Sequence, residues 1–125
     1  MPSIYDHELI SEILLQLHHS ILTIENRFLP VKSVSDLTDS DHGQEKLDAL
    51  CMQLIAIGES LKKLDKLTDG KLLSRYSDIE WKKAMGMRDV ITHHYFDINA
   101  EIVFSVCNGE LKEMRPVIER IIKEF

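Results

Sequence analysis

The chain has 125 residues, 44% of them hydrophobic and 29% charged, and its formal net charge is −6 at pH 7. This length predicts a single domain, residues 1–125, with one hydrophobic core, and the composition excludes a disordered chain. The acidic balance argues against a general nucleic-acid binder. Two cysteines, Cys51 and Cys107, are too few for a disulfide scaffold and lack the spacing of a zinc site.

The N-terminal residues do not have the basic start and apolar run of a secretory signal. The longest apolar stretches, near residues 54–57, fall far short of the ~20 residues that span a bilayer. We therefore expect a cytoplasmic protein that does not enter a membrane, with both cysteines buried and reduced.

The first predicted helix runs from about Ile4 to Phe28, because apolar residues recur there with helical spacing. Pro30 ends it. Residues 31–43 are rich in Ser, Asp and Thr, and this composition predicts a polar connection.

A second helix is expected to begin at the end of this polar connection and to run to about Leu67. Asp41 and Gln44 resemble a capping box at its start. Gly58 lies on its apolar stripe, where a glycine costs helix stability. We therefore expect another backbone to approach the helix closely at Gly58.

Three elements are predicted after Thr68-Asp69-Gly70 breaks the pattern. Residues 71–75 predict a short turn. Ser77 and Glu80 form a second candidate capping box, so a helix is expected from about Ile79, with apolar residues on one side as far as Tyr95.

Asn99 is expected to cap a short helix, residues 100–106, which Asn108-Gly109 ends. In the last helix, Pro116 is tolerable only in the first turn. Together these elements predict an all-α fold, an antiparallel four-helix bundle with a short additional helix.

Basic residues concentrate in one segment of this acidic chain. Residues 62–88 hold eight basic and four acidic side chains, a net charge of +4, which leaves −10 on the rest. A local positive region can hold a phosphate backbone while the remaining surface repels it. The alternative, that these side chains only solvate helix ends, is the better interpretation of this feature taken alone.

A candidate constellation for chemistry follows in residues 85–96. Asp89 and His93 are four apart, so on a helix they share a face and the carboxylate can orient the imidazole. Arg88 stands beside that face with a fork suited to phosphate. Gly86 leaves room there for a ligand or a second subunit. Short Arg, Asp and His strings also occur on solvated helix faces without any role, and from the residues alone that explanation is preferred.

The same segment resembles the signature of HepT-like HEPN ribonucleases, in which Arg is followed by four residues, His, one residue and Tyr. Here these are Arg88, His93 and Tyr95. The resemblance extends from about Asp48 to the C-terminus. Asp89 replaces the Asn of many relatives, and residues 111–116 lack their Leu-Pro. The flanking segments that match are Ala56 to Ser60, Trp81, Gly86-Met87-Arg88, Tyr95 to Ile98, and Ile102-Val103.

This resemblance implies an HEPN-type endoribonuclease toxin that needs no metal or other cofactor. His93 would be the acid/base, Arg88 would stabilise the phosphorane, and Asp89 would be the third catalytic residue. The resemblance also implies a homodimer or higher oligomer, and a minimal nucleotidyltransferase antitoxin as partner. That antitoxin would silence the toxin by transferring AMP to Tyr95.

Two alternatives remain beside this hypothesis. One is a helical module of the same fold that binds nucleotide or RNA and cleaves nothing. The other is a metal protein, since six histidines are many for this length. Adjacent histidines on a helix diverge by about 100° and do not chelate one ion together, and the chain has no HExxH motif. The six are His7, His18, His19, His42, His93 and His94.

Overall fold

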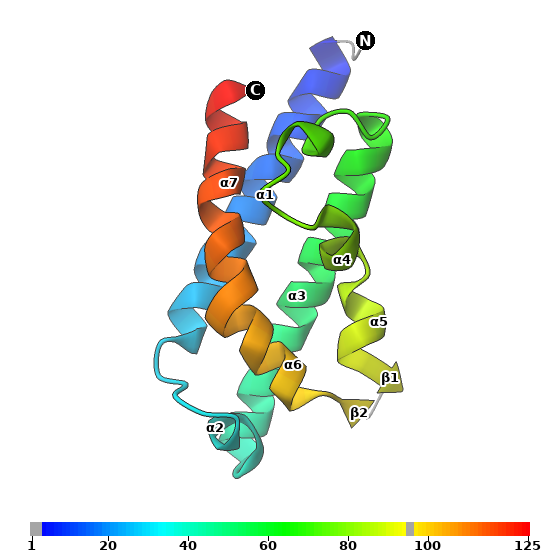
Figure 1. The fold of residues 1–125 in the computed structure, drawn as a ribbon. Coiled ribbons are helices and arrows are strands. Elements are labelled where there is room, and N and C mark those ends of the chain that lie inside the picture. Colours follow the sequence, from blue (N-terminus) through cyan, green and yellow to red (C-terminus); the bar gives the residue numbers. More distant parts are fainter. Residues whose placement is uncertain (1–3, 95–96) are drawn as a thin grey trace.

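The structure is a computed structural model that describes residues 4–94 and 97–125, with side chains described for residues 6–91 and 98–125. Helices dominate it and form a bundle with antiparallel neighbours, as Figure 1 shows. The predicted all-α fold class is therefore confirmed. The main elements are α1 (Ile4–Phe28), α3 (Asp41–Leu67), the broken pair α4 (Trp81–Met85) and α5 (Met87–Ile91), and α6 (Ala100–Ser105) with α7 (Leu111–Glu124).

Shorter elements connect these arms. Helix α2 (Ser35–Thr38) lies between α1 and α3, and a 3-10 turn, Leu73–Arg75, follows α3. A π-helical turn, Val106–Glu110, joins α6 to α7. Strands β1 (Thr92–His94) and β2 (Asp97–Ile98) pair antiparallel beyond the end of α5.

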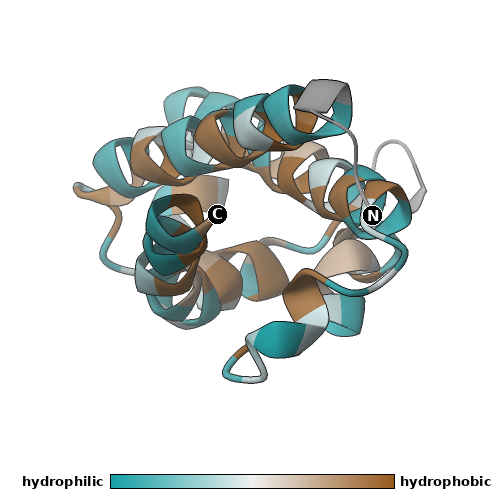
Figure 2. Ribbon diagram, turned by 90° about the horizontal axis from the view of Figure 1, so that it is seen from above, coloured by the Kyte–Doolittle hydropathy of each residue, from teal (hydrophilic) through white to brown (hydrophobic). Residues whose placement is uncertain are grey.

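The apolar faces of the arms meet in one core among the described residues. Figure 2 shows the hydrophobic residues of the helices turned largely toward the middle of the bundle. Burial of this apolar surface is the main favourable term in the stability of such a bundle. Large side chains that are fully buried in it include Ile10, Leu14, Leu17, Ile21, Ile24, Leu37, Leu50, Leu54, Ile57, Leu61, Leu64 and Leu73.

Helices α1 and α3 have the bounds that the apolar spacing predicts, but the cap of α3 differs from the prediction. Ser40, one residue earlier, is the N-cap, and its Oγ accepts a hydrogen bond from the Gly43 N–H at 3.0 Å. Asp41 is therefore the first helical residue rather than the cap. Both are good capping residues, and the extended backbone of Ser40 decides between them.

The polar connection contains an unpredicted helix, α2. The Asp36 carboxylate accepts hydrogen bonds from the backbone N–H groups of Lys32 and Ser33, at 2.7 and 3.2 Å. Leu37 is fully buried. One apolar side chain in four residues gives no periodicity to detect, so the sequence pattern does not reveal this helix.

Gly58 lies where α3 meets α4 and α5. The predicted close approach of another backbone at this glycine is confirmed. A Cβ added to Gly58 would lie 3.1 Å from the carbonyl oxygen of Ala84 and 3.4 Å from that of Met85. The missing side chain therefore lets the backbone of α4 approach α3.

The start of α4 differs from the second predicted capping box. The helix begins at Trp81, and its N-cap Glu80 makes no capping hydrogen bond through its side chain. Trp81 is buried, and its Nε1 donates to the Tyr76 carbonyl at 2.8 Å. Burial of the indole with its one donor satisfied fixes this end of the helix.

The C-terminal third corrects two further predictions. Asn108-Gly109 does not end a helix, because both residues lie inside the π-helical turn that joins α6 to α7. Pro116 therefore lies in the interior of a longer helical arm rather than in a first turn. It is exposed, as is Lys112 four residues earlier, so water can reach the carbonyl that lacks a donor. The predicted cap of α6 is confirmed, since the Asn99 side chain accepts from the Ile102 N–H at 3.1 Å.

Candidate functional site

Two short helices carry the segment that holds Arg88. Gly86 separates them: its N–H donates to the Lys82 carbonyl at 3.1 Å, and its own carbonyl accepts from the Asp89 N–H at 3.1 Å. The single helix predicted from about Ile79 to Tyr95 is therefore broken after Met85 and ends at Ile91. The space expected at Gly86 is modest, because an added Cβ would be in ordinary contact with the Lys82 carbonyl oxygen at 3.5 Å.

The exposed face of α5 carries Arg88, Asp89 and Val90. Met87 and Ile91 on the opposite face are buried in the core, with Ile91 fully inaccessible. This one-turn helix is too short to persist on its own, so its two buried ends hold it in place. The guanidinium and the carboxylate are thus presented to solvent from an anchored backbone.

The prediction that Asp89 and His93 share one face of a helix is wrong, because the helix does not reach His93. Helix α5 ends two residues before His93, which lies in β1. Thr92 pairs with Ile98 and His94 with Asp97, and the Asn99 N–H donates to the Ile91 carbonyl at 2.8 Å. These backbone bonds turn the chain back sharply, so the four-residue helical spacing does not apply.

The positions of two predicted site groups lie outside what the structure describes. Tyr95 falls between the end of β1 and the start of β2, outside the described residues, and for His93 only the backbone is described. The structure therefore brings Arg88 and Asp89 together on one turn and places the backbone of His93 directly after that turn.

The eight basic residues of segment 62–88 are all exposed. They lie on the end of α3, the connection after it, α4 and α5, which Figure 1 places along one side of the bundle. Surface ion pairs join Lys62 to Glu59 at 3.5 Å and Lys83 to Glu110 at 3.6 Å. Such pairs are weak, so these side chains can exchange partners with an approaching phosphate.

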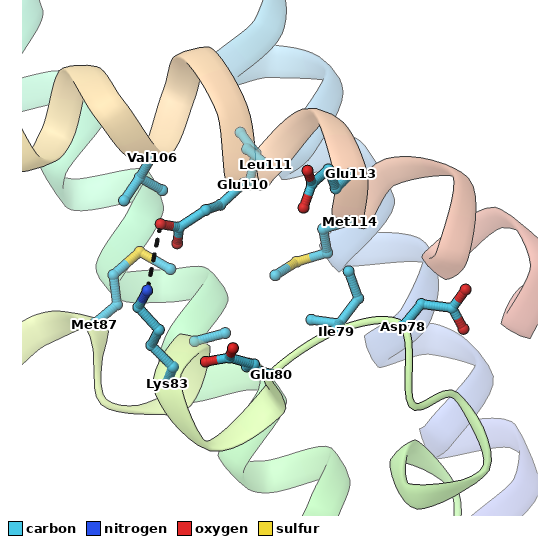
Figure 3. Close-up of a pocket in the computed structure, with 11 residues that line it drawn as sticks. Asp78, Ile79, Glu80, Lys83, Met87, Val106, Glu110, Leu111, Glu113 and Met114 are labelled. Atoms are coloured by element: carbon cyan, nitrogen blue, oxygen red, sulfur yellow. Dashed lines mark ion pairs between the residues drawn. The ribbon is translucent and has the colours of Figure 1, made fainter.

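A pocket of about 160 Å³ opens on the flank of α4 against the π-helical turn and α7 (Figure 3). Its floor is apolar and includes Met87 and Met114. Its rim carries one lysine, Lys83, and four carboxylates, those of Asp78, Glu80, Glu110 and Glu113. Neither Arg88 nor Asp89 lines it. Because its rim is acidic, this pocket is unsuited to a phosphate backbone, and sequence spacing alone does not reveal it.

Two histidines of α1 contact the C-terminal end of the chain. His18 Nε2 bonds Glu119 Oε2 at 2.9 Å, which ties α1 to α7, and this hydrogen bond is the main cause that lowers the pKa of Glu119. His7 stacks on Phe125 with ring centroids 4.2 Å apart. Within the described residues, no three His, Cys, Asp or Glu side chains gather where they could hold a metal ion.

Both cysteines are buried and unpaired, as predicted. Burial raises the pKa of Cys107 to about 12, and burial followed by the nearby charge of Asp48 raises that of Cys51. Neither thiol is poised as a nucleophile. Among the described residues, no helix combines the length and apolar character that a membrane crossing requires.

A comparison with protein families finds one match, to the family described as "Ribonuclease HepT-like", over residues 10–121. The chain belongs to the HepT-like ribonuclease family. The matched region runs from α1 into α7 and includes Arg88, Asp89, His93 and Tyr95.

Relatives of this HepT-like chain carry names of the same kind. It is 29% identical over 104 residues to "Putative RNase MJ0127" of Methanocaldococcus jannaschii, which covers 82% of this chain and 83% of the relative. It is 30% identical to "Putative RNase TTE0752" of Caldanaerobacter subterraneus, over 61% of this chain and 64% of that one.

A third relative is longer. The M. jannaschii protein named "Gamma-glutamylcyclotransferase and putative RNase MJ0434" is 25% identical over 91% of this chain, and the match spans 49% of its own length. No solved structure matches this HepT-like chain.

Proposed function

We propose that this chain is a metal-independent endoribonuclease toxin of a toxin–antitoxin pair. The observation that carries the proposal is the family membership, together with an exposed Arg88 and Asp89 on an anchored turn that leads directly into His93. The positive segment 62–88 adds an approach for the RNA backbone.

The proposed reaction is attack of a ribose 2′-hydroxyl on the adjacent phosphorus. His93 takes the hydroxyl proton as general base, and Arg88 offsets the charge of the phosphorane. The bond to the 5′-oxygen then breaks, and the protonated His93 returns its proton to that oxygen as general acid. The products are a 2′,3′-cyclic phosphate and a 5′-hydroxyl end. DNA lacks the attacking hydroxyl and is therefore not a substrate.

The proposal includes two partners. A homodimer would place two positive segments around one axis and strengthen the field that holds an RNA strand. A minimal nucleotidyltransferase antitoxin would silence the enzyme by adding AMP to Tyr95, which carries a charged phosphodiester and a bulky nucleoside into the site.

The test of the chemistry is cleavage of a labelled RNA by purified wild-type protein and single variants. We expect Arg88→Ala and His93→Ala each to lower the cleavage rate by about 10²-fold or more. Lys112→Ala, an exposed change on α7, is the matched control and should retain the wild-type rate. Circular dichroism should show the same helical content in every variant.

Two further arms separate this reaction from its alternatives. Activity should persist in EDTA, and an identical DNA strand should remain intact. Binding of RNA without cleavage by the wild type would favour the non-catalytic binding module. Loss of cleavage in EDTA that a divalent ion restores would favour metal-dependent chemistry instead.

A further inference from the structure

The pocket on the flank of α4 takes no part in the proposed cleavage, because neither Arg88 nor Asp89 lines it (Figure 3). Its floor consists of apolar side chains that are themselves buried, among them Met87, Leu111 and Met114. Methionine is unbranched and flexible, so it adapts to the shape of an apolar guest. At about 160 Å³ the cavity is smaller than the ~300–1,000 Å³ of sites for drug-sized ligands, so it suits a small apolar body.

Two irregular helical elements form the walls of this pocket. The π-helical turn contributes Val106 and Glu110, and the short helix α4, which ends at Met85, contributes Lys83 and Ala84. A π-helical turn within a longer helical arm is frequent at functional sites. Figure 3 shows the ion pair between Lys83 and Glu110, 3.6 Å long, that joins the two walls.

The four carboxylates of the rim differ in whether a cation already compensates them. Asp78 pairs with Arg120 at 3.1 Å, and Glu110 has its lysine partner. Glu80 and Glu113 are exposed, and neither side chain has an ion pair or a hydrogen bond to any part of the chain that the structure describes. Figure 3 shows these two on opposite sides of the pocket, Glu80 at the start of α4 and Glu113 on α7. The rim therefore carries an uncompensated carboxylate on each side of an apolar floor.

This arrangement favours an extended organic cation over a metal ion. A divalent metal gathers several oxygen ligands within about 2.0–2.6 Å of one point. Within residues 6–91 and 98–125, however, no three acidic, histidine or cysteine side chains converge in that way. An ammonium group, in contrast, is satisfied by one carboxylate and a few water molecules, and it tolerates an attached apolar stem.

We propose that this pocket binds a linear aliphatic diamine, which carries an ammonium group at each end of an apolar stem. One ammonium binds the Glu80 carboxylate and the other binds that of Glu113. The methylene stem lies on the floor beside Met87 and Met114, where its burial is favourable. The Lys83 ammonium competes for the same rim, but its surface pair is weak and yields to a bound cation.

The test is isothermal titration calorimetry of the whole chain with putrescine, a four-carbon diamine, at low salt and without RNA. We expect saturable binding of one diamine per chain with a negative heat-capacity change, because apolar surface leaves water. Butylamine has the same stem and only one ammonium, so it should bind about fivefold more weakly. Magnesium chloride at an equal concentration should not displace the diamine.

Variants that change one charge locate the site. Glu80→Gln and Glu113→Gln should each raise the dissociation constant for putrescine about fivefold. Lys83→Met should lower it about threefold, because it removes the competing ammonium beside Glu110. Glu45→Gln on α3 makes the same charge change outside the pocket and is the control, which should leave the constant unchanged. All four side chains are exposed, so circular dichroism should match the wild type in every variant.

Three results would overturn the proposed site. These are the absence of binding at millimolar putrescine, binding of butylamine as tight as that of putrescine, and equal weakening by Glu45→Gln and Glu113→Gln. The last result would mean that an acidic chain attracts cations at many places rather than in this pocket. Since RNA is absent from every titration, failure of this proposal leaves the proposed cleavage untouched.

Discussion

Arg88 and Asp89 are adjacent in the chain and exposed on one turn. Their proposed roles differ in the group that each side chain must reach. Arg88 needs only to reach a phosphate, and its long side chain can do so from an anchored backbone. In the proposed mechanism Asp89 acts on His93, which follows the end of α5 rather than lying on the same helix.

Asp89→Asn tests this action. Loss of a nearby negative charge disfavours the protonated imidazole, so the acidic limb of the pH–rate profile should move to lower pH, by up to about one unit. The measurement is the cleavage rate per enzyme between pH 5 and 8. An unchanged limb with a normal rate would show that Asp89 does not act on His93.

Tyr95 is the residue at which control is predicted. Incubation with the cognate nucleotidyltransferase and ATP should add one adenylyl group or more to the wild type and stop cleavage. Tyr95→Phe should remain folded, stay unmodified and remain active. Intact-mass spectrometry gives the readout, and AMP found on Tyr95→Phe as readily as on the wild type would assign control to another residue.

At the scale of elements, the close packing of α4 on α3 depends on the missing side chain of Gly58. The π-helical turn does not depend on Gly109 in this way. An added Cβ at Gly58 would lie 3.1 Å from a backbone oxygen, but at Gly109 it would meet nothing within 4 Å. Gly109 also has no positive φ. The same substitution should therefore have opposite effects at the two positions.

Gly109→Ala should stabilise the protein by about 0.4–1 kcal/mol, because it reduces the freedom of the unfolded chain without strain. Gly58→Ala should lose that gain and be destabilising, because the backbone of α4 must move to admit the methyl group. Urea unfolding followed by circular dichroism measures both. Equal stabilisation by the two variants would mean that α4 is free to shift.

At the scale of the whole molecule, the two thiols report on the integrity of the core. Burial raises the pKa of Cys107 to about 12, so at pH 8 this thiol is protonated and inaccessible. A disulfide reagent should leave both cysteines unmodified in the native protein and label both in guanidinium chloride. Lys112→Cys supplies an exposed thiol on α7 as a control and should react at once. Rapid labelling of the native wild type would contradict the packed core.

Much of the fold follows from local sequence. The bounds of α1 and α3, the Asn99 cap and the close approach at Gly58 are all predicted from apolar spacing and residue type. These features depend on neighbours in the chain, and the 3.6-residue period makes them visible. The basic segment 62–88 and the adjacent Arg88 and Asp89 can also be identified from the sequence, because they too are formed by residues close together in the chain.

Tertiary structure decides the rest, because it depends on contacts between distant residues. The sequence favours one helix through His93, but buried Met87 and Ile91, and the bond from Asn99 to Ile91, end α5 early and start a strand. Asn108-Gly109 has the composition of a helix end, yet packing of Val106 and Leu111 carries the helical arm through it. In both places the core fixes residues on either side of a weak local preference, and burial outweighs that preference.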